Sequence, residues 1–86
     1  MKLIKSQNKL AIVNAKYIHR IDIEDGVDEK GKTTNHMDID IYFDSHENSW
    51  MQTIATYRTT EESIHNLNKL ADFLSSSNDS GLYEMP

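Results

Sequence analysis

Imidazole and carboxylate side chains gather in one short segment of the sequence. Alternate positions on a strand share one face, so these side chains would combine nitrogen and oxygen ligands of the kind that manganese, iron or zinc accepts. Such positions lie about 6.6 to 7 Å apart, so a second strand would have to complete the site. We therefore predict no metal site and keep His36, Asp38 and Asp40 as weak candidates. The full set is His36, Asp38, Asp40, Asp44 and His46.

The sequence contains no recognisable motif for other kinds of catalysis. Cysteine is absent, which excludes thiolate nucleophiles, disulfides and cysteine-based zinc sites. No serine stands in a nucleophile-elbow pattern, and the glycine-rich phosphate motifs are missing. We expect a protein that is not an enzyme, with no catalytic residues and no cofactor.

Strands must position most of these side chains. Met37, Ile39, Ile41 and Phe43 alternate with polar residues at the period of a strand. The polar stretch over residues 25–35 predicts a mobile loop before that strand. Period-two patterns separated by polar turn clusters predict strands over residues 2–5, 10–13, 17–24, 37–44 and 50–57.

A single helix is predicted near the end of the chain. Thr59 and Glu62 have the spacing of a capping box, and apolar residues at helical spacing follow it. The helix should cover residues 60–75, and residues 79–86 should form a flexible tail. The expected fold class is α+β, with residues 1–78 as one domain. The five strands form an antiparallel meander, either open or curled into a partial barrel, and the helix is C-terminal.

One helix covers only one face of such a sheet, yet several predicted strands carry apolar residues on both faces. Leu3 opposes Ile4, and Trp50 opposes Met51. The second face must be covered either by closure of a barrel or by a second copy of the chain. We favour a homodimer. Its predicted interface consists of Trp50, Met51, Ile54 and Tyr57.

Charge is distributed unevenly along the chain. The formal net charge is −5, which disfavours non-specific binding to nucleic acid, but residues 1–20 contain five basic residues and no acid. A small nucleic-acid-associated factor is therefore the alternative function. Five side chains could stack on the bases or neutralise the phosphates of single-stranded nucleic acid: Lys16, Tyr17, Arg20, Tyr57 and Arg58.

Residues 14–23 and 54–74 carry an Asn-containing turn before a strand, a Thr-Tyr pair, a Thr-Glu-Glu helix start and a Leu-rich helix. In this layout the chain resembles short uncharacterised proteins of Gram-positive bacteria and their phages, a resemblance that implies no activity. The longest apolar run, residues 10–13, predicts neither a membrane span nor a signal-peptide core, and hence a cytoplasmic location. We predict a non-enzymatic, homodimeric protein-interaction module with a protein partner that the sequence does not identify.

Overall fold

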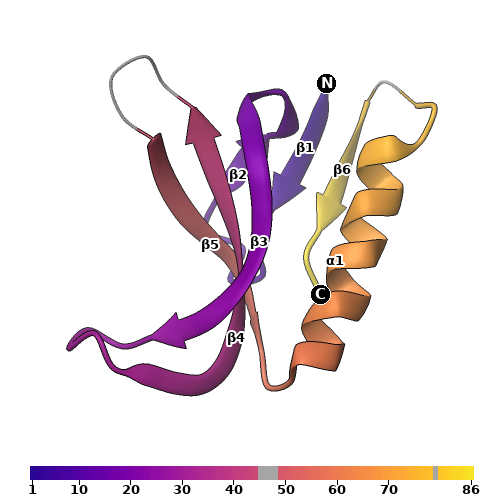
Figure 1. Ribbon diagram of the computed structural model, residues 1–86. Coiled ribbons are helices and arrows are strands. Elements are labelled where there is room, and N and C mark those ends of the chain that lie inside the picture. Colours follow the sequence, from indigo (N-terminus) through magenta and orange to yellow (C-terminus); the bar gives the residue numbers. More distant parts are fainter. Residues whose placement is uncertain (45–48, 79) are drawn as a thin grey trace.

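Two three-stranded sheets and one α-helix make up the part of the chain that the structure, a computed structural model, describes: residues 1–44, 49–78 and 80–86 (Figure 1). Sheet A has the strand order β2-β1-β6, and sheet B has the order β3-β4-β5. The elements are β1 (Lys2–Lys5), β2 (Ile12–Asn14), the 3-10 turn η1 (Ala15–Tyr17), β3 (Ile18–Val27), β4 (Thr33–Asp44), β5 (Ser49–Tyr57), α1 (Thr60–Ser75) and β6 (Gly81–Glu84).

The α+β class is confirmed, but the prediction of one five-stranded meander is wrong. Only β3, β4 and β5 form an antiparallel meander, and sheet B is not a closed barrel. The side chain of Asn14 accepts a hydrogen bond from the Lys16 backbone N–H at 3.0 Å and caps η1, which redirects the chain between β2 and β3. β1 and β2 therefore pair with each other in a second sheet.

The third strand of sheet A comes from the segment predicted as a flexible tail. β6 pairs parallel to β1, with Leu3 opposite Leu82 and Ile4 opposite Tyr83. A parallel partner requires a long crossover, and here the crossover consists of the whole of sheet B and α1. Figure 1 shows β6 lying between β1 and α1.

The predicted loop over residues 25–35 is shorter in the structure, because β3 continues to Val27 and β4 begins at Thr33. The Asp28 side chain accepts hydrogen bonds from the backbone N–H groups of Lys30 and Lys32 and closes the turn, with Gly31 at a φ of +80°. A Cβ on Gly26 would lie 2.5 Å from Thr34 Oγ1, so only glycine fits the bulge there.

The predicted helix over residues 60–75 is α1. Thr59 Oγ1 accepts a hydrogen bond from the Glu62 backbone N–H at 3.1 Å, which satisfies one of the open donors of the first turn. At the other end, Lys2 Nζ donates to the carbonyl oxygens of Phe73, Leu74 and Ser76 at 3.0, 2.8 and 2.9 Å. No helical segment in the described residues has the length and apolar character to span a bilayer.

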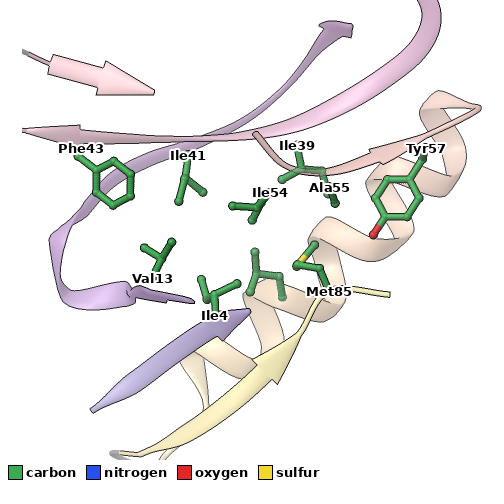
Figure 2. Packing of buried hydrophobic residues seen from close by; sticks show 10 residues of the cluster. Ile4, Val13, Ile39, Ile41, Phe43, Ile54, Ala55, Tyr57 and Met85 are labelled. Carbon is green, nitrogen blue, oxygen red and sulfur yellow. The ribbon is translucent and has the colours of Figure 1, made fainter. Parts of the chain in front are cut away.

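The core lies between the inner face of sheet B on one side and sheet A with α1 on the other (Figure 2). A bulge in β5 turns two successive residues inward, because Ile39 pairs with Ala55 and Asp40 pairs with Thr53, leaving Ile54 between them. The Ile54 carbonyl accepts a hydrogen bond from the Gln7 backbone N–H at 2.8 Å. The cluster consists of Ile4, Val13, Ile39, Ile41, Phe43, Ile54, Ala55, Tyr57, Leu70 and Met85.

We predict that Lys2→Met lowers the free energy of unfolding by about 1–2 kcal/mol, because three carbonyl groups at the end of α1 lose a charged donor. Lys5→Met is the matched control. Among the described residues, the ammonium group of Lys5 has one partner, Glu84, in a partly exposed ion pair at 3.7 Å, so its replacement should cost less than about 0.5 kcal/mol. Urea denaturation measures both changes, and equal costs would contradict the role given to Lys2.

Candidate functional site

The structure places the metal-site candidates on and beside the outer face of sheet B. On this face, two cross-strand pairs bring four carboxylates together: Asp22 lies opposite Asp40, and Glu24 lies opposite Asp38. We call the set Arg20, Asp22, Glu24, Asp38, Asp40 and Tyr42 the acidic face. His36 is exposed further along β4.

The two candidate carboxylates already have hydroxyl partners on β5. Thr53 Oγ1 donates to Asp40 at 2.6 Å, and Thr56 Oγ1 donates to Asp38 at 2.8 Å. Within residues 1–44, 49–78 and 80–86, no three His, Asp or Glu side chains lie close enough to hold a metal ion. Asp44 and His46 have side chains outside the described part of the chain.

Asp40 is the unusual member of the acidic face, because its exposed fraction is only 3%. Burial raises the pKa of Asp40 to about 6; the hydrogen bond with Glu24 and the charges of Glu24 and Asp38 add to the rise, and the Thr53 hydrogen bond opposes it. Hydrogen bonds from Tyr42 and Asp40 lower the pKa of Glu24. When the pair binds one proton, that proton therefore resides on Asp40, and Asp40 loses it as the pH rises through about 6.

Arg20 supplies the positive charge of this face. Its Nε atom lies 2.8 Å from an Asp22 oxygen, and its guanidinium lies 4.2 Å from the centre of the Tyr42 ring. The Tyr42 hydroxyl donates to Glu24, which raises the pKa of Tyr42. The acidic face is thus a hydrogen-bonded network with a net negative charge.

The four residues of the predicted dimer interface do not lie on one surface of the chain. Ile54 and Tyr57 are buried in the core. Trp50 is exposed but stacks on Phe43 with ring centroids 4.4 Å apart, and Met51 is exposed on the opposite face of β5. The β5 bulge, which the sequence pattern does not reveal, turns Ile54 and Ala55 inward together, so that Ile54 and Tyr57 both face the core.

An exposed apolar surface instead lies on the outer face of sheet A. Ile4, Val13 and Tyr83 point toward the core, so their neighbours point outward. Leu3 is half-buried there, whereas Ile12 and Leu82 are 57% and 49% exposed. We call Leu3, Ile12 and Leu82 the apolar face. The apolar residues on both sides of β1 are the sequence signal for it, but Leu82 lies in the segment predicted as a tail.

The candidates for nucleic-acid contact are also separated. Lys16, Tyr17 and Arg20 line one groove of the surface. The Tyr57 hydroxyl donates to the Pro86 carbonyl inside the protein at 2.9 Å, and Arg58 is exposed beyond the end of β5. These five side chains therefore form no continuous stacking platform.

Comparison with models of known protein families gives no match for this chain, and comparisons with curated proteins and with solved structures give none either. The resemblance to short proteins of Gram-positive bacteria and phages stays a prediction. The assignment of function therefore depends on the surfaces described above.

We predict that Asp40→Asn raises the free energy of unfolding at pH 7 by about 1–2 kcal/mol. The folded-state pKa of Asp40, about 6, lies above its ordinary value of 3.8. The folded protein therefore binds an extra proton between these values, and stability falls as the pH rises from about 4 to 6. Asparagine can accept a hydrogen bond from Thr53 and donate one to Glu24, and it has no buried carboxylate to ionise as the pH rises.

Chemical denaturation between pH 4 and 8 measures the effect. Asp38→Asn is the control, because it removes a charge from the same face but leaves Asp40 in place. The fall in stability between pH 4 and 6 should persist in Asp38→Asn and shrink in Asp40→Asn. Equal pH profiles for the two variants would show that Asp40 does not hold the proton.

Proposed function

We propose that the protein is a non-enzymatic interaction module that forms a homodimer through the apolar face of sheet A. The observation that carries the proposal is the exposure of Ile12 and Leu82 on a sheet face that no described part of the chain covers. Exposed apolar patches on one side of a small protein are typical of protein contacts.

The balanced local charge of this face makes it the surface at which a second copy of the chain can be accommodated. Each copy carries a net charge of −5, so two copies repel unless neutral surfaces meet. Lys5 and Glu84, 3.7 Å apart, lie on the same outward face, and Lys5 is directly opposite Ile12. In a two-fold dimer, Lys5 of one copy can pair with Glu84 of the other, because such an interface is self-complementary.

The acidic face of sheet B is a poor alternative for self-association. Asp22, Glu24, Asp38 and Asp40 share that face with Arg20 as the cation. Two such faces in contact would bring like charges together and remove them from water, which costs free energy. This face is better suited to remain solvated.

The size of the apolar face sets the expected strength of the dimer. A stable interface buries about 800 Å² on each partner, and three side chains on one short sheet supply less than that. The contact must therefore extend beyond these three side chains to other exposed apolar residues, such as Leu10 in the turn before β2. We therefore expect weak self-association, with a dissociation constant of about 1–100 µM.

Sedimentation equilibrium tests the proposal, at protein concentrations both below and above the expected dissociation constant. The wild-type chain should show a reversible monomer–dimer equilibrium. Leu82→Glu should make the chain monomeric, because a carboxylate in the contact has no partner. Ile64→Glu is the matched control, since Ile64 is 46% exposed but lies on α1.

Two results would contradict the proposal. One is a wild-type chain that remains monomeric at the highest concentration. The other is dissociation by Ile64→Glu but not by Leu82→Glu, which would move the interface to α1.

A further inference from the structure

A groove with a volume of about 840 Å³ lies where three parts of the fold meet. One wall consists of η1 and the beginning of β3, and the other consists of the start of β1 and the C-terminal end of α1. The volume is within the range of sites that hold small molecules. The groove does not include the apolar face, since Leu3, Ile12 and Leu82 are not among the residues that line it.

Aliphatic and aromatic side chains line much of this groove. Ile18, Ile21 and Leu74 are half-buried and pack against the core cluster. Tyr17 is 63% exposed at the rim. A ligand with an apolar body would remove these surfaces from water, which is the main source of affinity in such a site.

The charge of the groove differs in sign from that of the whole chain. None of its described lining residues is acidic, although the chain has a net charge of −5. Lys2, Lys16 and Arg20 all contribute to the lining. The groove is therefore a region of positive potential on an acidic protein, and it favours an anionic ligand.

Only one of these cations is available for direct contact with a ligand. Lys2 Nζ donates to three carbonyl groups at the end of α1, and Arg20 is paired with Asp22. Lys16 Nζ has no acidic partner among the described residues and lies 5.9 Å from the centre of the Tyr17 ring. With Lys16 as the available lysine or arginine side chain, the groove suits a ligand with one anionic group better than a polyanion, which needs several.

We propose that this groove binds a small amphiphile that has an apolar body and a single carboxylate or phosphate head group. The body lies over Ile18, Ile21 and Leu74, and the head group lies beside Lys16. Carboxylate and phosphate share the chemistry that a lysine recognises, because its ammonium group acts as a point charge. The proposal is independent of self-association, which uses another surface.

Isothermal titration calorimetry with four probes tests the ligand class. Octanoate and octyl phosphate should both bind, and the tighter of the two identifies the preferred head group. Acetate, which has the charge without the chain, should not bind. Octanol, which has the chain without the charge, should bind more weakly than octanoate.

Charge-reversal variants locate the head group. Lys16→Glu should weaken octanoate binding about tenfold, because a nearby attraction becomes a repulsion, and should leave octanol binding within about twofold. Lys30→Glu is the matched control, since it changes the charge of the chain equally at the distant hairpin turn. It should change octanoate affinity less than about twofold.

Two further variants locate the apolar body. Tyr17→Ala should weaken binding of both octanoate and octanol, since Tyr17 contributes apolar surface at the rim. Leu82→Glu should leave octanoate binding unchanged, because Leu82 lies on the apolar face. In nuclear magnetic resonance spectra, octanoate should shift the amide signals of residues 14–21 and 74–78, the two segments that contribute most of the lining of the groove.

Several outcomes would overturn this assignment. Equal effects of Lys16→Glu and Lys30→Glu would show that only the overall charge matters. Loss of octanoate binding in Leu82→Glu with retention in Lys16→Glu would place the amphiphile on the apolar face. Steeply salt-dependent binding of a short single-stranded oligonucleotide, without binding of octanoate, would make the groove a nucleic-acid site instead.

Discussion

The burial of Ile39, Ile41 and Ile54 depends on two separate covers over one face of sheet B. A helix is about 10 Å wide, whereas three twisted strands together are at least roughly that wide. α1 alone would therefore leave part of this face exposed to solvent. Sheet A completes the cover with Ile4 and Val13. The parallel pairing of β1 with β6 and the contact of Lys2 with the end of α1 hold the two covers side by side.

This arrangement also determines which surfaces the protein presents. Sheet B turns its acidic face outward, because the opposite face contributes Ile39, Ile41 and Ile54 to the core. Sheet A has only one face in the core, so Ile12 and Leu82 stay exposed. The groove lies at the seam where η1, the start of β3 and the end of α1 meet. The three surfaces thus have different chemistry and can act separately.

The sequence was sufficient for the elements that local physics determines. The capping threonine and the helical spacing locate α1, and the strict alternation in residues 37–44 separates the acidic face from the core. The sequence was insufficient where the structure of a segment depends on pairing with a distant part of the chain. β6 is four residues long and gains its structure by pairing with β1, and the β5 bulge that turns both Ile54 and Ala55 inward has no local signature. The burial of Asp40 follows from its position on the central strand between Asp22 and Thr53, which a pattern along one strand does not show.

The pairing of β1 with β6 also affects how the chain folds as it leaves the ribosome. Gln7 Nε2 donates to the Pro86 carbonyl, a contact between residues 79 positions apart. At about 5–20 residues per second, β1 waits roughly 4–16 s for its parallel partner to be synthesised. During that interval β1 has an unpaired edge and the inner face of sheet B lacks part of its cover. Sheet A and the cover of the inner face of sheet B are therefore completed only after β6 has been synthesised.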